Sequence, residues 1–407
     1  MRENTPPRSP MDEHLLEYED DDEEVILLGD ADEVLDAWEA EANLDEDDEE
    51  AKEDDGGTVS FRTCDRDDAK LTFTKHTATV FCGALHPTED LAITGGEDDK
   101  AYVWNIRSGE VQFEVTNHTD SVVAVGFSYD GVFAATADIA GYIQVFKVQQ
   151  NYRKVWEFNV GDLCWMRWHS AAHVLLAGCD SGDVYVWRIP SGDCKVLPGQ
   201  DHKTEAAELT HDGKKLAVGY GNGHFKLWDL KSGTPVMEVD ATVGHKTNIT
   251  TLSIDQENQL FVTGAEDGSS YVMGPNGVLG MLTGPSDALL EAVLIDYPGF
   301  EIKVAVTGTL QGKVTIWDVA RQTKRVECVD EEPTGITRMV WLKDHAICAG
   351  TLGGLIKAWD FRSGAKRFTL DGHTNDIQDV VYDRERNIIL STSEDFTAKI
   401  FEVPASQ

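Results

Sequence analysis

A bulky hydrophobic residue, most often tryptophan, recurs along this chain at a nearly constant interval, each time at the end of a short alternating apolar pattern. The interval is 41 to 45 residues, which is the length of one four-stranded blade of a β-propeller. The repeat predicts an all-β propeller of eight blades, and a seven-bladed ring with one degenerate extra repeat is the competing architecture. The eight recurring residues are Trp104, Phe146, Trp187, Trp228, Met273, Trp317, Trp359 and Phe401.

The first repeat shows how one blade is read from its sequence. Apolar residues alternate within the segments 80–85, 91–96, 100–106 and 111–115, and Gly, Asp, Pro and Ser lie between these segments. Short antiparallel strands joined by hairpins have this pattern. The inner strands of the later blades are expected to begin near Val122, Leu163, Ala206, Ile249, Leu290, Ile336 and Ile377.

The last repeat ends after its third strand, so its sheet needs an outer strand from elsewhere in the chain. The segment from Leu71 to Thr74, just before the first repeat, has the right alternation to supply it. Such pairing would close the ring and remove two exposed sheet edges. We therefore expect truncation before Leu71 to be tolerated, and truncation to about residue 80 to open the ring.

A strongly acidic leader precedes the repeats. Residues 11–55 carry 24 Asp or Glu and a single lysine, Lys52, so this segment repels itself and has little to bury. We expect residues 1–69 to be an acidic, largely disordered leader and residues 70–407 to be the propeller. Two apolar clusters interrupt the acid, at 25–28 and around Trp38. The second could dock on a partner or on the propeller, or the whole leader could act only as a solvating tail.

The overall charge restricts the class of partner. The formal net charge is −38, so nucleic-acid phosphates would be repelled at long range and a basic protein segment would be attracted. The seven cysteines contain no CxxC pair, which is typical of a reducing cytoplasm or nucleus. No early segment resembles a secretory signal, and no apolar run has the length of a membrane span. We expect a cytoplasmic monomer, with the nucleus as a further location.

A set of polar residues in the first repeat gives the repeat type. It consists of His76, Thr94, Asp98 and Trp104, and it resembles the signature of the WD-repeat family. In that family these residue types form a buried hydrogen-bond chain from Trp through Ser or Thr and His to Asp. The same set recurs, with changes at the aromatic position, as His245, Thr263 and Asp267, and as His373, Ser391 and Asp395.

This set could be mistaken for a catalytic triad, because it also contains a hydroxyl, an imidazole and a carboxylate. A structural role is favoured, because an enzyme needs one nucleophile and the set is repeated in several blades. Cysteine and histidine pairs are isolated, and the alternation of side chains along a strand would face many of them apart, which argues against a metal site. The glycine-rich stretches open no helix and lack a phosphate-binding lysine. We expect no catalytic site, no metal and no cofactor.

Acidic residues gather in the loops that hold the His and Asp of each blade, which a propeller places on one face around its channel. They could be ordinary solvated charges, or they could add into one negative field that steers a cationic ligand and then pairs with Arg or Lys. The candidate partner-binding acids are Glu97, Asp99, Asp120, Asp138, Asp162, Asp180, Asp201, Glu205, Glu266, Asp287, Glu331, Asp376 and Glu394.

One aromatic residue joins these candidates. Trp165 aligns with Ala124 of the preceding repeat, so it is either a plug in the channel or an exposed anchor for a partner.

Several segments narrow the resemblance further. The sequences at 94–104, 161–169, 175–195 and 218–233 resemble the angio-associated migratory cell protein family. That resemblance implies an acidic leader and an eight-repeat propeller. It also implies one of two roles: cell migration and angiogenesis in animals, or, as in a fungal relative, a chaperone for a basic large-subunit ribosomal protein. Our leading hypothesis is a non-enzymatic protein that captures a basic ribosomal protein segment on its acidic face. A signalling or cytoskeletal scaffold is the alternative.

Overall fold

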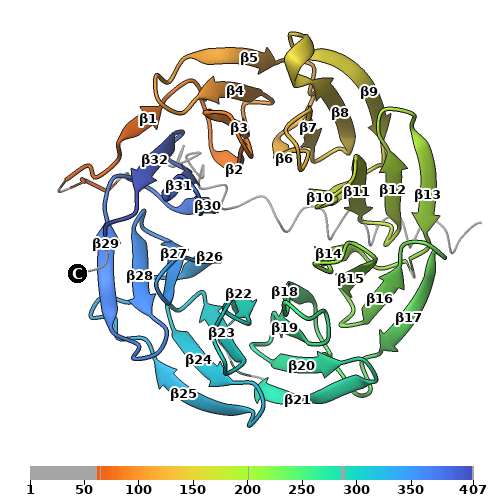
Figure 1. Cartoon of the computed structure of the whole chain (residues 1–407), viewed down its shortest axis with the longest axis vertical. Helices are drawn as coiled ribbons and strands as arrows, with labels where there is room; N and C mark the ends of the chain where they lie inside the picture. The colour runs from red at the N-terminus through yellow and green to blue at the C-terminus, as the bar shows by residue number, and fades with distance from the viewer. Residues whose placement is uncertain (1–61, 65, 200, 285, 287–288, 406–407) are drawn as a thin grey trace, which may run out of the picture. The chain divides into compact units, whose positions relative to one another are not determined.

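A computed structural model describes residues 62–64, 66–199, 201–284, 286 and 289–405. From residue 61 onward the chain forms one compact unit. Eight four-stranded antiparallel sheets follow one another around a central channel (Figure 1). The eight-bladed prediction is confirmed, and the seven-bladed alternative is wrong. Among the described residues, no helix has the length and apolar character needed to cross a membrane.

Each blade runs from an inner strand at the channel to an outer strand at the periphery. Blade one consists of β2 (Val80–Leu85), β3 (Leu91–Gly96), β4 (Ala101–Asn105) and β5 (Val111–Val115), and blade two of β6 (Val122–Phe127), β7 (Phe133–Asp138), β8 (Tyr142–Lys147) and β9 (Arg153–Asn159). Blade three consists of β10 (Leu163–Trp168), β11 (Val174–Cys179), β12 (Val184–Arg188) and β13 (Asp193–Leu197), and blade four of β14 (Thr204–Leu209), β15 (Lys215–Tyr220), β16 (Phe225–Asp229) and β17 (Thr234–Val239). A short 3₁₀ helix, η1 (Val148–Gln150), lies between β8 and β9.

Blades five to seven have the same order, and blade eight takes its outer strand from the start of the described chain. Blade five consists of β18 (Ile249–Ile254), β19 (Phe261–Ala265), β20 (Ser270–Gly274) and β21 (Gly277–Thr283), and blade six of β22 (Leu290–Ile295), β23 (Val304–Thr309), β24 (Val314–Asp318) and β25 (Thr323–Glu327). Blade seven consists of β26 (Ile336–Trp341), β27 (Ala346–Thr351), β28 (Ile356–Asp360) and β29 (Lys366–Leu370), and blade eight of β30 (Ile377–Asp383), β31 (Ile388–Ser393), β32 (Ala398–Glu402) and β1 (Leu71–Phe73).

The pairing of β1 with β32 closes the ring. Leu71 lies opposite Ile400, and Phe73 lies opposite Ala398. The Phe73 ring also stacks on the Trp104 indole of blade one, with centroids 4.6 Å apart and planes 8° apart. The predicted closing strand is therefore confirmed, and its last side chain also packs blade eight against blade one.

The segment before β1 is held against blade eight and the loop that precedes it. The Arg62 guanidinium pairs with Asp371 and donates to the His373 carbonyl over 2.8 Å. The ammonium of Lys399, which is almost fully buried, donates to Asp67 over 2.8 Å. The sequence predicts that the propeller begins at residue 70, and these contacts are made by residues that precede it.

The recurring bulky residues form the core between the sheets. All eight are buried, and Trp104, Trp187, Met273 and Trp359 are 0% exposed. Buried clusters join neighbouring blades, as where Trp104 of blade one packs with Leu390 and Ile400 of blade eight. Because each apolar sheet face is covered by the next blade, no blade could bury its core alone.

Every inner strand carries a bulge at its second residue. In blade one, Val80 pairs with Gly96 and Cys82 pairs with Gly95, which leaves Phe81 between them without a partner of its own. The same register shift occurs in the other seven blades. A bulge bends its strand and re-aims the side chains that follow, so the eight inner strands bend alike at one mouth of the channel.

Candidate partner-binding rim

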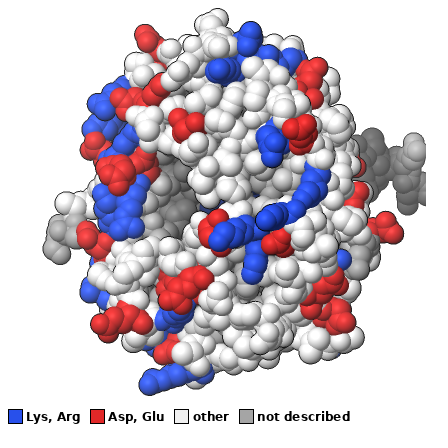
Figure 2. Space-filling model, turned by 45° about the vertical axis from the view of Figure 1, so that its right-hand side comes forward, with Lys and Arg blue, Asp and Glu red and all other residues white. Residues whose placement is uncertain are grey.

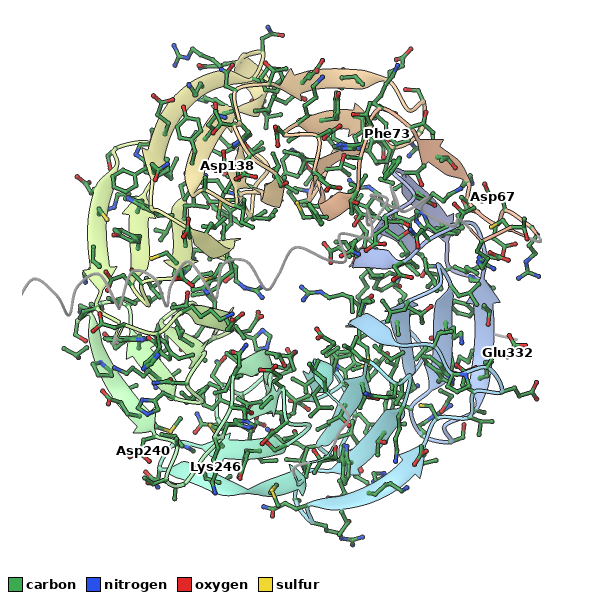
Figure 3. The ribbon with its side chains drawn as sticks, turned by 180° about the vertical axis from the view of Figure 1, so that it is seen from behind. Asp67, Phe73, Asp138, Asp240, Lys246 and Glu332 are labelled. Carbon is green, nitrogen blue, oxygen red and sulfur yellow. The ribbon has the colours of Figure 1, made fainter. Side chains whose placement is uncertain are left out.

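Two sets of loops meet at the bulged ends of the inner strands. One set connects the outer strand of a blade to the next inner strand, and the other connects the second strand to the third. We call these two sets together the rim, and the loops at the other end of the blades the opposite loops. Asp240, Lys246 and Glu332, labelled in Figure 3, lie in loops of the rim.

One backbone hydrogen bond fixes the two loops to each other in every blade. The first residue after the second strand donates its N–H to the carbonyl just before the inner strand, over 2.8 to 3.1 Å. The pairs are Glu97 with Thr79, Ile139 with Ser121, Asp180 with Asp162, Gly221 with Lys203, Glu266 with Asn248, Leu310 with Leu289, Leu352 with Gly335, and Glu394 with Asp376. The rim is therefore a ring of eight equivalent positions held by the backbone.

Charge differs between the two ends of the blades. The described residues of the rim loops include 18 Asp or Glu and five Lys. The opposite loops include 11 Asp or Glu and nine Lys or Arg. The five rim lysines are Lys75, Lys100, Lys203, Lys246 and Lys313.

Within the rim, the acids are unevenly distributed. Of the eight residue pairs joined by this backbone hydrogen bond, those of blades eight, one, three and five contain an acidic residue. The pairs of blades two, six and seven contain no charged residue. In blade seven, Lys357 and Lys366 neutralise Asp330. At the paired positions the acids are therefore confined to four of the eight blades.

Three carboxylates meet where blade eight adjoins blade one. Burial raises the pKa of Glu394 above its ordinary value, and the carboxylates of Asp376 and Glu97 raise it further. The Gln378 amide donates to Glu394 over 2.8 Å, which holds that carboxylate at the channel mouth. A carboxylate whose pKa is raised by neighbouring like charges favours binding of a cation, because the cation relieves this repulsion.

Most of the predicted rim acids are accessible and unneutralised. None of the following takes part in an ion pair with another described residue: the exposed Glu97, Asp120, Asp162, Asp180, Asp201, Glu266 and Glu331, and the half-buried Asp99, Asp376 and Glu394. Glu205 differs, because Lys203 pairs with it. Asp287 lies outside the described residues.

Asp138 must be removed from the set of partner-binding candidates. Its side chain is 0% exposed and accepts from His118 Nδ1 over 3.0 Å. His118 Nε2 bonds to Thr136 over 2.8 Å. Blade two thus has a complete His chain that the sequence reading missed, because its Asp follows Thr136 by two residues instead of four. The signal was the pairing of His118 with Thr136 at the same 18-residue separation as in blade one.

Blade one contains the hydrogen-bond chain expected from its sequence. His76 bonds to Asp98 over 2.9 Å through Nδ1 and to Thr94 over 3.0 Å through Nε2. The Trp104 indole donates to the Thr94 hydroxyl over 3.3 Å. The imidazole proton is therefore on Nδ1, and the Thr94 hydroxyl donates to Nε2.

Blade eight repeats the chain without an indole. His373 bonds to Asp395 and to Ser391, each over 2.8 Å. Burial raises the pKa of Asp395, but the bonds from His373 and Thr397 outweigh burial and lower it to about 2. The carboxylate is thus held as an anion inside the blade.

Blade five differs from the expected chain. His245 Nδ1 bonds to the Ser269 hydroxyl over 2.8 Å, and Ser269 donates to Asp267 over 2.6 Å. The direct His245 to Asp267 bond is absent because Ser269 lies between them, while Nε2 still bonds to Thr263 over 2.8 Å. Burial lowers the pKa of His245 to about 4. In all these chains the hydroxyl and the imidazole are almost fully buried, out of reach of a substrate, which suits a structural role.

Trp165 is not an exposed anchor. Its half-buried indole packs with Leu176 and Leu216 in the cluster between blades three and four. It covers Gly178, where an added Cβ would lie 2.4 Å from the indole ring. Only glycine leaves room for the indole at this position, so Trp165 joins two blades and belongs to the core.

Among the residues that the structure describes, no group of three His, Cys, Asp or Glu side chains is placed to hold a metal ion.

Comparison with known families identifies the repeats. The family model described as WD domain, G-beta repeat matches residues 68–105, 236–272 and 364–402. These segments contain His76, His245 and His373, the histidines of blades one, five and eight. The WD-repeat resemblance is therefore confirmed.

Comparison with individual proteins extends the likeness to the whole propeller. The chain is 22% identical over 402 residues to the ribosome assembly protein SQT1 of Saccharomyces cerevisiae, which covers 88% of this chain and 92% of that protein. The crystal structure of Chaetomium thermophilum Sqt1 bound to the N-terminus of the ribosomal protein L10 has a TM-score of 0.75 and 20% identity. It covers 83% of this chain and 100% of the other, and this likeness shows a shared fold.

A third relative is more similar in sequence. The chain is 37% identical over 350 residues to the angio-associated migratory cell protein of Homo sapiens, which covers 82% of this chain and 80% of the relative. From this identity and coverage we conclude that the chain belongs to the angio-associated migratory cell protein family.

Proposed function

We propose that this chain is a non-enzymatic chaperone that holds a basic segment of a ribosomal protein on its rim during assembly of the large ribosomal subunit. The observation that carries the proposal is the group of unneutralised rim carboxylates centred on Asp376, Glu394 and Glu97. A segment rich in Arg or Lys would be attracted to these carboxylates and would then pair with them. The chain would act as a monomer in the cytoplasm, with the nucleus as a further location.

Two relatives support this choice of cargo. SQT1 of Saccharomyces cerevisiae is named a ribosome assembly protein, and Chaetomium thermophilum Sqt1 has been crystallised with the N-terminus of the ribosomal protein L10. A negatively charged holder would mask the RNA-binding charge of such a cargo and prevent misplaced contacts with RNA. The burial of the His, Ser and Thr side chains, which keeps them from any substrate, supports the non-enzymatic part of the proposal.

Charge reversal on the rim tests this proposal. Replacing Glu97, Asp162 and Asp180 together by Lys should weaken binding of a basic N-terminal ribosomal protein peptide at least about tenfold at low salt, because each exposed ion pair is worth up to about 1 kcal/mol. The matched control replaces Glu110, Glu301 and Glu385 of the opposite loops by Lys, since these three acids are also exposed. Fluorescence anisotropy measures both affinities.

The control separates local pairing from net charge. Both triple variants change the net charge equally, so the proposal requires the rim variant to lose much more affinity than the control. It also requires wild-type binding to weaken as salt rises, because salt screens exposed charges. Equal losses in the two variants, or salt-independent binding, would contradict capture on the rim.

The alternative function is a signalling or cytoskeletal scaffold in cell migration and angiogenesis. The observation in its favour is the name of the relative that is 37% identical. A scaffold would retain several protein partners at high salt, and charge reversal on the rim would leave their binding unchanged. The same rim variant therefore distinguishes the two functions when co-purified partners are compared at low and high salt.

A further inference from the structure

A groove of about 710 Å³ lies between blades three and four, away from the rim. Its apolar lining includes Val174 of β11, Val186 of β12 and Leu230, which follows β16. All three side chains are half-buried. The groove therefore offers apolar surface that the fold leaves partly open to solvent.

Two contacts between blades bound this groove. The His169 imidazole of blade three bonds to the Gly213 carbonyl of blade four over 2.8 Å. The Lys195 ammonium of β13 donates to the carbonyls of Leu230 and Lys231, over 3.1 Å and 2.6 Å. These residues also line the groove, so both walls are fixed by contacts that cross from one blade to the other.

The edge of the groove is basic. Arg188, Lys214 and Lys231 line it and are all exposed. Arg188 lies 3.9 Å from Asp193, and Lys214 lies 3.6 Å from Asp212, both at the limit of an ion pair. Lys231 forms no ion pair with another described residue. Figure 2, turned so that the flank of blades three and four comes forward, shows Lys and Arg side chains running across the surface.

We propose that this groove binds a short acidic peptide segment of a partner protein, with apolar side chains between its carboxylates. The apolar residues would cover Val174, Val186 and Leu230, and the carboxylates would pair with Arg188, Lys214 and Lys231. The groove is basic and would bind an acidic segment, whereas the rim is acidic and would bind a basic one. One chain would thereby hold a basic cargo at the rim and an acidic partner on its flank.

A peptide fits the groove better than RNA. A phosphate backbone brings one charge per nucleotide and would meet Asp193 and Asp229, which also line the groove, as well as the net charge of −38. Apolar burial contributes about 25 cal/mol per Å² and is unaffected by that repulsion. A peptide with a few carboxylates meets less of this repulsion than RNA and still gains from both the floor and the edge.

The test uses the full chain and a short fluorescent peptide that alternates Glu with Leu and Trp. Replacing Lys214 and Lys231 by Glu should weaken its binding about tenfold or more. The matched control replaces Lys343 and Arg384 by Glu, which changes the net charge equally in the opposite loops of blades seven and eight. An oligoglutamate peptide without apolar residues should also bind at least about tenfold more weakly, because it cannot cover the floor.

Cys194 gives a local readout, because it lines the groove and is exposed. Bound peptide should slow alkylation of Cys194, as followed by mass spectrometry, in the wild type and in the control variant. Equal peptide affinity in both double variants, or no protection of Cys194, would overturn the proposal. Tighter binding of single-stranded RNA than of the peptide would reassign the groove to nucleic acid.

This inference does not depend on the proposed function. Lys214→Glu with Lys231→Glu should not weaken the affinity of the rim for a basic peptide, so failure at one site can be distinguished from failure at the other.

Discussion

Individual buried residues show how the blades stay rigid. The His chains of blades one, two, five and eight tie a rim loop to the second strand through side chains that are almost fully buried. A buried polar group contributes little net stability when paired but costs about 1–3 kcal/mol when its partner is removed. Each chain therefore penalises any movement of the rim loop that would leave a histidine or an aspartate unpaired.

Thr94→Val tests this at one position. Valine keeps the shape of threonine but leaves His76 Nε2 and the Trp104 N–H without a partner. The free energy of unfolding should fall by about 1–3 kcal/mol, as measured by urea denaturation. The control is Thr116→Val at an exposed position, which should change it by less than about 0.5 kcal/mol. Equal losses of unfolding free energy in the two variants would show that the hydrogen-bond chain of His76 does not contribute to stability.

The histidines also predict a pH dependence. Burial lowers the pKa of His245 to about 4 in the folded protein, whereas an unfolded histidine has a pKa of about 6.5. Between these values the unfolded state takes up a proton and the folded state does not. His245 therefore lowers stability as pH falls from about 6.5 to 4, by up to about 1.4 kcal/mol per pH unit.

Replacing His245 by Gln should remove this contribution. Urea unfolding measured at several pH values should give a smaller loss of stability on acidification for the variant than for the wild type, whatever its stability at neutral pH. An unchanged pH slope would mean that His245 is not buried as a neutral imidazole.

At the scale of elements, the closing strand and its preceding segment form one unit. Removing residues 1–61 keeps Arg62, Asp67 and β1, so the midpoint of thermal unfolding should stay within a few degrees of the full chain. Removing residues 1–70 keeps β1 but leaves the buried Lys399 ammonium without Asp67. We expect this second truncation to lower the midpoint by several degrees, since an unpaired buried charge is costly.

Removing residues 1–79 deletes β1 and the His76 loop. The edge of β32 is then exposed, and the midpoint should fall furthest, with association of the opened rings seen by light scattering. Equal midpoints for the truncations at 61 and 70 would show that the Arg62 and Asp67 contacts add no stability, in agreement with the simpler expectation from sequence that only β1 matters.

The strands could be read from the sequence because their signals are local and repeat eight times. The period located every blade, and the missing fourth strand of the last repeat pointed to Leu71 and its neighbours. Side-chain partners were harder to predict. Asp138 and Ser269 join their His chains at unusual spacings, and the bulge beside Trp165 re-aims that side chain. Loop geometry decides these contacts, and the alternation of apolar residues carries no information on it.

At the scale of the whole propeller, charge distinguishes the two ends of the blades. The rim combines 18 acids with five lysines, whereas the opposite loops are close to balanced. Sequence could predict that acids gather in the rim loops, but it could not show which carboxylates are already used. The structure assigns Asp138 to a His chain and pairs Glu205 with Lys203.

Zero-length crosslinking with a carbodiimide tests the central claim most directly, because it joins a peptide lysine only to a carboxylate that it touches. A lysine-containing basic ribosomal protein peptide is bound to the full chain at low salt, and the crosslinked residues are identified by mass spectrometry. The account predicts crosslinks at rim acids, above all Glu97, Asp376 and Glu394, that disappear at high salt. Crosslinks in the propeller confined to opposite-loop acids such as Glu110 and Glu301 would contradict it.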